Sequence, residues 1–235
     1  MALALRHENK YLISRTQYEV LSRSLKGVLN LDANAVRNGG HYHIRSLYFD
    51  TVFDDALYDK IDGVQDRDKY RMRIYNYSSK EIFMECKTKY GSFISKRSLK
   101  IPRDLADQLI AGDPSGLENT RYGLLRDVYK EMRTKLLHPV VLVDYLREAY
   151  VHPAEEVRIT FDMQLRSGLN SIDIFNPAVP TISPLDNEDL MILEIKYNRV
   201  LPPYIAELCS FACPEPVQQA VSKYCLCRRF EGKDA

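Results

Sequence analysis

The most regular feature of the 235-residue chain is a set of short stretches in which charged and apolar residues alternate. In residues 69–75 (KYRMRIY), Lys69, Arg71, Arg73 and Tyr75 share one parity, and the residues between them are Tyr70, Met72 and Ile74. Residues two apart on a β-strand lie on the same face of the sheet. The pattern therefore predicts a strand with one charged and one apolar face.

Alternation, together with runs of β-branched and aromatic residues, predicts eight strands. They lie at residues 6–13, 43–50, 69–75, 81–89, 92–101, 140–150, 156–162 and 191–197. Gly91 separates two of them at the spacing of a hairpin turn.

Apolar residues at helical spacing predict a helix that begins after Ser14 as its N-cap. The same spacing predicts helices over residues 104–110 and 121–137, the latter ended by Pro139, and a helical region from residue 204 onward.

This series of elements indicates an α+β fold built on an antiparallel sheet. Because the strands carry charge on one face and apolar residues on the other, we expect a closed eight-stranded antiparallel β-barrel with the helices packed outside. An ordinary sheet with its charged face in bulk water is the alternative. The length fits one large domain or two small ones, and we expect a single domain over residues 1–235.

The balanced overall charge disfavours one class of function, nucleic-acid binding. The chain has 33 Lys and Arg against 32 Asp and Glu, whereas nucleic-acid-binding domains are usually more basic. No apolar run approaches the ~18 residues of a membrane-spanning helix, and charged residues follow soon after Met1, so we expect a soluble cytoplasmic protein. The five cysteines lack the Cys-x-x-Cys spacing of zinc sites, which indicates buried free thiols.

The charged faces share a repeated motif, Glu-x-Lys. It occurs as Glu8 with Lys10, Glu85 with Lys87, and Glu194 with Lys196. Arg71 and Arg73 also share a face, and two like charges repel unless an anion lies between them. Arg binds phosphate through two parallel hydrogen bonds. The pattern favours a polyphosphate-type anion, although cross-strand Lys–Glu pairs on a wet surface would give the same alternation.

Glu194 is the best candidate metal ligand, because it lies among apolar residues and a hard divalent cation binds carboxylate and phosphate oxygens. A salt bridge to Lys196 is the alternative. We find no P-loop, no Gly-x-Gly-x-x-Gly and no nucleophilic triad. Phosphoryl transfer does not require these, because it depends on positioning and charge neutralisation.

Eight blocks of the chain resemble, in order, the VTC domain, the polyphosphate polymerase domain of the vacuolar transporter chaperone complex and its stand-alone bacterial relatives. The blocks are RHENKYLIS, IRSLYFDT, KIDGVQDRDKYRMRIYN, MECKTKYGSFISKRS, VDYLREAY, VRITFD, ILEIKYNRVLP and SKYC. The resemblance implies the triphosphate-tunnel fold, a barrel whose interior is lined by Lys, Arg and Glu. It also implies ATP-dependent polyphosphate synthesis with Mn²⁺ or Mg²⁺.

The resemblance further implies roles for the matching residues. The catalytic set would be Arg71, Arg73, Lys87, Arg147 and Glu194, with Glu194 as the metal ligand. Further phosphate contacts would come from Lys10, Lys96, Tyr145, Arg158, Lys196, Ser222 and Lys223.

The sequence departs from the family pattern in three places. Ala220 stands where the family has a basic residue, which predicts one phosphate contact fewer. Arg6 stands where tunnel triphosphatases of the adenylate-cyclase and thiamine-triphosphatase branch have Glu, which disfavours that branch. The phosphate-sensing domain and membrane helices of the eukaryotic complex are not recognisable.

Three functions remain open from the sequence. A polyphosphate polymerase using ATP is the first, a tunnel triphosphatase that hydrolyses short phosphate chains is the second, and a non-catalytic module that binds polyphosphate or inositol phosphates is the third. We expect ATP and polyphosphate or triphosphate as partners and no nucleic acid. A separately encoded membrane partner is compatible with the sequence.

Overall fold

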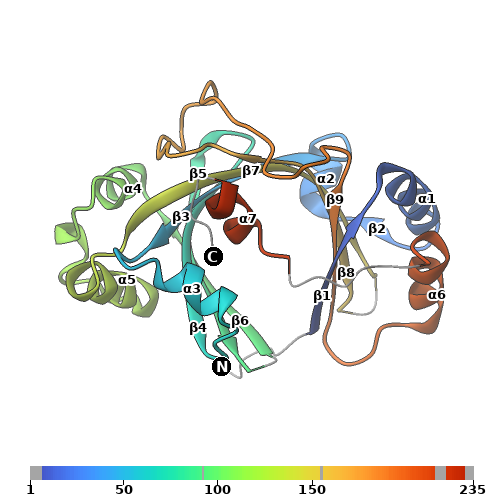
Figure 1. Cartoon of the computed structure of the whole chain (residues 1–235), viewed down its shortest axis with the longest axis horizontal. Helices are drawn as coiled ribbons and strands as arrows, with labels where there is room; N and C mark the ends of the chain where they lie inside the picture. Colours follow the sequence, from blue (N-terminus) through green and yellow to red (C-terminus); the bar gives the residue numbers. More distant parts are fainter. Residues whose placement is uncertain (1–6, 92, 154–155, 215–220, 231–235) are drawn as a thin grey trace. The chain divides into compact units, whose positions relative to one another are not determined.

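The computed structural model describes residues 7–91, 93–153, 156–214 and 221–230 (Figure 1). Within these residues the chain forms nine strands, seven α-helices and one 3-10 helix, so the fold is α+β as predicted. The chain divides into two compact units. Unit 1 comprises Met1–His43, Tyr145–Leu165 and Leu185–Ser222, and unit 2 comprises Ile44–Asp144, Arg166–Pro184 and Lys223–Ala235.

Unit 1 is built on the strand order β1-β9-β8-β7. These strands are β1 (His7–Ile13), β9 (Met191–Tyr197), β8 (Arg158–Ser167) and the second half of β7 (His138–Val151). The pairings of β9 with β1 and with β8 are antiparallel, and they place Glu194 opposite both Lys10 and Thr160. The short strand β2 (Asn30–Leu31) pairs with β7.

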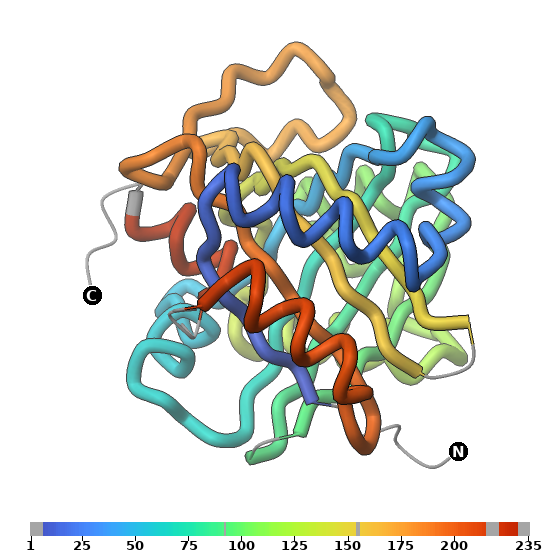
Figure 2. Tube along the Cα trace, turned by 90° about the vertical axis from the view of Figure 1, so that its right-hand side faces the viewer, coloured from blue at the N-terminus to red at the C-terminus, as the bar shows by residue number. Residues whose placement is uncertain are grey.

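Helices cover the apolar face of unit 1. α1 (Arg15–Lys26) begins with a capping box, in which Ser14 and Gln17 exchange side-chain to backbone hydrogen bonds. α6 (Pro203–Ala212) lies beside α1, as Figure 2 shows, and both pack on the same hydrophobic cluster. The short helix α2 (Ala33–Arg37) follows β2. The charged residues of β1, β8 and β9 therefore lie on the face opposite α1 and α6.

Unit 2 is built on the strand order β7-β3-β4-β5-β6. Besides the first half of β7, its strands are β3 (Tyr42–Asp50, from Ile44 onward), β4 (Arg67–Tyr75), β5 (Ser78–Tyr90) and β6 (Phe93–Ile101). β4, β5 and β6 form an antiparallel meander, and Gly91 makes the last turn with a positive φ of 53°.

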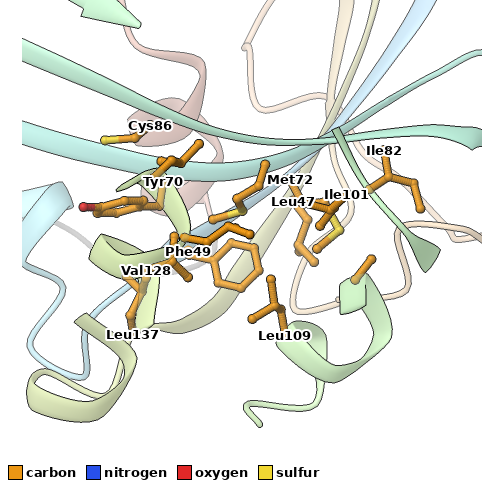
Figure 3. Close-up of a cluster of buried hydrophobic side chains, with 14 of the residues drawn as sticks. Leu47, Phe49, Tyr70, Met72, Ile82, Cys86, Ile101, Leu109, Val128 and Leu137 are labelled. Carbon is orange, nitrogen blue, oxygen red and sulfur yellow. The ribbon is translucent and has the colours of Figure 1, made fainter. Parts of the chain in front are cut away.

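One apolar face of unit 2 packs against helices. α4 (Arg103–Ile110), η1 (Ser115–Leu117) and α5 (Gly123–Thr134) supply Leu109, Leu117 and Val128 to the cluster. The cluster includes Met72 of β4 together with Phe49 of β3, and Figure 3 shows these side chains turned toward the helices. The charged residues of β4 and β5 have the other parity and lie on the other face. α3 (Asp55–Ile61) and α7 (Lys223–Phe230) complete the unit.

Most predicted elements are confirmed to within a few residues at each end, apart from Arg6 and Ser92, which lie outside the described residues. The prediction for residues 121–137 is wrong at its end. α5 stops at Thr134, because Leu136 has a left-handed φ of 53°, and Pro139 lies near the start of β7 rather than after a helix.

Each unit has an open strand order with a terminal strand, β1 in unit 1 and β6 in unit 2. The structure thus supports the antiparallel α+β part of the fold prediction, and a closed barrel is not among its observations.

The longest described helices, α1 and α5, have 12 residues each, and none of the described helices is long and apolar enough to cross a bilayer.

Candidate functional site

In unit 2, three cationic side chains converge on one carboxylate, Glu85 of β5. Arg71 lies directly opposite on β4, with its Nε 2.7 Å and its Nη2 2.6 Å from Glu85 Oε2. Arg73 Nη1 lies 3.5 Å from the same oxygen, and Lys96 Nζ of β6 lies 2.9 Å from Oε1. Three cationic side chains from β4 and β6 thus contact the same carboxylate of β5.

The environment keeps Glu85 ionised. Burial alone would raise the pKa of this carboxyl, which is only 2% exposed, but Arg71, Arg73 and Lys96 outweigh burial and hold the pKa far below its usual range. The carboxylate cannot gain a proton to reduce its hold on the cations at neutral pH. Glu85 therefore remains a negatively charged partner of these three side chains.

Tyr48 of β3 lies in the positive electrostatic potential of the same side chains. Its hydroxyl accepts a hydrogen bond from Arg71 Nη1 at 3.1 Å. Burial raises the pKa of a phenol, yet Arg71, Arg73 and Lys223 together bring the pKa of Tyr48 below its usual value. A potential that favours a phenolate favours other anions as well.

Helix α7 brings Lys223 to this cluster. The next residue, Tyr224, is buried and donates a hydrogen bond to Asp50, whose carboxylate also accepts from the amides of Ala56 and Leu57 at the start of α3. Arg228 on the following turn donates to Asp54. α7 is thus fixed to α3 and the end of β3 by two charged or polar contacts.

In unit 1, two lysines alternate with two glutamates across β1 and β9. Lys10 Nζ lies 3.0 Å from Glu8 Oε1 and 3.6 Å from Glu194 Oε1. Lys196 Nζ lies 3.1 Å from Glu194 Oε2 and 3.7 Å from Glu8 Oε2. The motif Glu-x-Lys on two antiparallel neighbours therefore produces a four-charge network in which each carboxylate contacts both ammonium groups.

Arg147 of β7 adds a further cation to this network. It binds Asp162 of β8 through two hydrogen bonds of 2.6 and 2.7 Å, and its Nη2 lies 3.8 Å from Glu194 Oε2. Burial would lower the pKa of Arg147, but Asp162 and then Tyr145 and Glu194 raise it well above its usual value. This guanidinium is a permanent charge.

Arg158 is the first residue of β8 and lies opposite Lys196 of β9. Its Nη2 donates to Asp32 at 2.7 Å and to the Tyr42 hydroxyl at 3.1 Å. Two buried polar atoms here, Arg158 Nε and Thr160 Oγ1, have no hydrogen-bond partner within the described residues. They are groups that a ligand can satisfy.

The donor set of unit 1 suits a hard divalent cation that arrives with its own oxygen ligands. Glu8 and Glu194 offer carboxylate oxygens, and the Thr160 hydroxyl lies on the strand position opposite Glu194. Across the described ranges, no group of three or more His, Cys, Asp or Glu side chains could hold a metal ion. Glu8 and Glu194 are the carboxylates of this network that could hold such an ion, and each is in contact with Lys10 and Lys196.

The structure divides the predicted site residues between the units. Unit 1 contains Lys10, Tyr145, Arg147, Arg158, Glu194, Lys196 and Ser222, and unit 2 contains Arg71, Arg73, Lys87, Lys96 and Lys223. Ala220 lies outside the described residues. Within each unit the geometry brings most of these side chains to one face, and their roles stay predictions.

Sequence reasoning assigned no role in the site to the acidic residues that hold these cations. Glu85 and Asp162 contact four of the predicted cations between them, and Asp32 contacts Arg158. The alternation of residues along the strand does indicate Glu85, because it places Glu85 on the same face as Lys87. Nothing local marks Asp32, because it precedes α2 and reaches Arg158 across 126 residues of sequence.

Comparison with known proteins identifies the family. The model of the VTC domain matches residues 5–230. The chain belongs to the VTC domain family. A search among curated proteins finds no match.

The similar solved structures have low sequence identity to this chain. A proposed adenylate cyclase from Bacillus halodurans is 11% identical, with a TM-score of 0.55, and the match covers 94% of this chain and 97% of that one. The PH1819 protein from Pyrococcus horikoshii OT3 is 10% identical, with a TM-score of 0.47, over 95% and 98% of the two chains. The first likeness shows a common fold and carries no statement about activity.

Proposed function

We propose that the protein is an ATP-dependent polyphosphate polymerase. The observation that carries the proposal is the convergence of Arg71, Arg73 and Lys96 on the carboxylate of Glu85, on one strand face of a VTC-family chain. Such a face suits a linear polyanion. The proposal includes the closed barrel implied by the family resemblance, one domain over residues 1–235, and a cytoplasmic location.

In the proposed reaction, an oxygen of the terminal phosphate of the growing chain attacks the γ-phosphorus of ATP. The bond between that phosphorus and the oxygen bridging to the β-phosphate breaks, and ADP leaves. Arg71, Arg73, Lys87 and Arg147 would neutralise the phosphate oxygens during transfer. No protein nucleophile is required, because the acceptor phosphate supplies the attacking oxygen.

The remaining predicted contacts would hold the chain on either side of the transferred group. These residues are Lys10, Lys96, Tyr145, Arg158, Lys196, Ser222 and Lys223. Glu194, with Glu8 and Thr160 beside it, would hold Mn²⁺ or Mg²⁺, and such an ion would neutralise negative charge on the phosphates.

Product analysis tests the proposal. Purified protein is incubated with ATP and Mn²⁺, and the products are separated on a polyacrylamide gel stained for polyphosphate. A ladder of long chains is the expected result. ADP and orthophosphate without chains would contradict the polymerase and indicate a triphosphatase. No turnover, together with tight triphosphate binding, would contradict any enzymatic function and indicate a binding module.

A further inference from the structure

A cavity of about 280 Å³ lies in unit 2, between α3, the C-terminal end of α5 and the strands β4 and β5. Tyr70 and Asp68 of β4 line it, and so does Thr88 of β5, whose hydroxyl donates a hydrogen bond to Asp68. These strand residues have the opposite parity from Arg71 and Glu85, so the cavity lies on the helix-covered face of the meander. It is therefore separate from the candidate phosphate site.

Carboxylates dominate the wall of this cavity. Two cationic side chains, Arg67 and Lys135, line it together with six acidic ones, which are Asp50, Asp55, Asp59, Asp66, Asp68 and Glu131. Lys135 Nζ lies 3.1 Å from Glu131 Oε2, and Arg67 donates to the carbonyl of Val64. Burial, followed by the charges of Asp55 and Asp50, raises the pKa of Asp59. The carboxylates thus repel one another, and a cationic ligand would offset this repulsion.

The hydroxyl of Tyr70 gives independent evidence for a ligand. Tyr70 is only 6% exposed and lines the cavity, and among the described residues its hydroxyl has no hydrogen-bond partner. Figure 3 shows this hydroxyl pointing away from Met72 and the hydrophobic cluster. Buried hydroxyl groups in proteins are nearly always paired, so this one is a group that a bound molecule can satisfy.

The Tyr70 hydroxyl suits a ligand that carries N–H donors. Burial, followed by Cys86 and Asp68, raises the pKa of Tyr70 far above its usual value. The phenol therefore keeps its proton at neutral pH, and its neutral oxygen can accept a hydrogen bond from an ammonium group. A cation held by the carboxylates would supply that donor.

The rest of the wall favours an organic amine over a metal ion. Within the described ranges, no group of three or more His, Cys, Asp or Glu side chains could hold a metal ion. Phe49, Ala56 and Leu137 also line the cavity, so apolar surface lies among the carboxylates. An aliphatic chain with ammonium groups at intervals would match both kinds of surface. The volume is near the lower end of the range for ligand pockets, roughly 300–1,000 Å³, which suits a small molecule.

We propose that this cavity binds a linear aliphatic polyamine. Its ammonium groups would lie against the carboxylates of α3 and β4, one of them would donate to the Tyr70 hydroxyl, and its methylene groups would contact Phe49 and Leu137. The inference does not depend on the proposed function, because its ligand is a cation and its residues lie on the other face of the meander.

Calorimetric titration at constant ionic strength tests the inference with butylamine, putrescine and spermidine as probes. For the wild type we expect affinity to rise with the number of ammonium groups. Asp59→Asn should weaken spermidine binding about tenfold, the magnitude of one charge-assisted contact, and Tyr70→Phe about fivefold. Asp104→Asn is the matched control, because it removes an exposed carboxylate of α4 in the same unit, and it should bind as the wild type does.

Several results would overturn the inference. These are absence of spermidine binding by the wild type, equal affinity for butylamine and spermidine, and equal spermidine affinity of the wild type and Asp59→Asn. Loss of affinity in Asp104→Asn as large as in Asp59→Asn would show a diffuse attraction to surface charge, and Mg²⁺ binding tighter than spermidine would show an ion site; either would overturn it too. If Asp59→Asn does not fold, Asp55→Asn takes its place with the same expected result.

Discussion

Arg71 and Glu85 lie directly opposite each other on β4 and β5, and both Nε and Nη2 of Arg71 contact one carboxylate oxygen of Glu85. Arg73 contacts that oxygen as well. Glu85 thus acts as an internal counter-ion for the cations that we assign to phosphate. A bound phosphate chain would therefore contact cations that Glu85 already partly neutralises.

Replacing the Glu85 carboxylate should make the melting temperature depend more strongly on bound phosphate. Glu85→Gln leaves Arg71, Arg73 and Lys96 without their common carboxylate, and loss of one partner of a buried charge cluster costs about 3 kcal/mol. The expected result is a lower melting temperature than wild type without ligand and a larger rise on addition of tripolyphosphate. Differential scanning calorimetry measures both quantities.

The control for Glu85→Gln is Glu81→Gln on the same strand. Glu81 is exposed and pairs with Lys100 at 3.2 Å, so its removal should change the melting temperature little. A Glu85→Gln protein that gains no more from tripolyphosphate than the wild type does would contradict the counter-ion role.

Glu194 is predicted to link the metal to turnover. Glu194→Gln should lower metal-dependent turnover of ATP by about 10²–10³-fold, by analogy with other charge-stabilising groups, while the circular dichroism spectrum remains that of the wild type. Glu188→Gln, at an exposed position outside β9, should be fully active. Unchanged turnover in Glu194→Gln would remove this residue from the metal site.

Arg147 and Asp162 should behave as one energetic unit. Arg147→Met leaves a buried carboxylate without its partner and should cost about 3–5 kcal/mol of unfolding free energy. The double variant Arg147→Met/Asp162→Asn should be more stable than the sum of the single variants predicts, because the uncompensated charge is gone. Urea denaturation of all four proteins measures the coupling.

The exposed pair of Arg15 and Glu19 on α1 is the matched control for this cycle, and its coupling should be below about 0.5 kcal/mol. A coupling for Arg147 and Asp162 as small as that of the surface pair would show that the buried contact is not formed in solution.

The surroundings of Glu148 predict a pH dependence of stability that does not involve the charged strand faces. It lies next to Arg147 on β7 with the opposite parity, and it accepts hydrogen bonds from Tyr18, Ser22 and Tyr150. Burial raises its pKa, but the hydroxyl donors outweigh burial, so the folded-state pKa is below its usual value.

A depressed folded-state pKa means that Glu148 stabilises the fold above its unfolded pKa, about 4.3, and that this contribution is lost as the pH falls through the folded value. The difference in unfolding free energy between wild type and Glu148→Gln should therefore shrink from pH 6 to pH 3. A difference that stays constant over this range would contradict the assignment. Tripolyphosphate binding should be equal in the two proteins.

Strand parity was the part of the site that could be predicted from sequence. Arg71 and Arg73 were placed on one face with Glu85 and Lys87 on the neighbouring strand, because alternation determines the face of each residue. The pairing partners could not be predicted, since register depends on contacts between strands distant in sequence. Glu194 opposite Lys10, 184 residues earlier, is an example.

Helix ends and short elements were predictable only where a local signal exists. Ser14 and Gln17 carry the capping signal of α1, and α1 begins where predicted. The end of α5 depends on the left-handed backbone of Leu136, a residue type without preference for that conformation. α7 is held by Asp50 and Asp54 through tertiary contacts that its eight residues do not reveal.

The most direct test of the central claim, that the cationic face of unit 2 binds a phosphate chain, is calorimetric titration of the wild type and Arg71→Met with tripolyphosphate at two salt concentrations. We predict saturable binding that weakens with salt, and at least tenfold weaker binding by Arg71→Met. Equal affinity of the two proteins, or absence of binding by a folded wild type, would contradict the account.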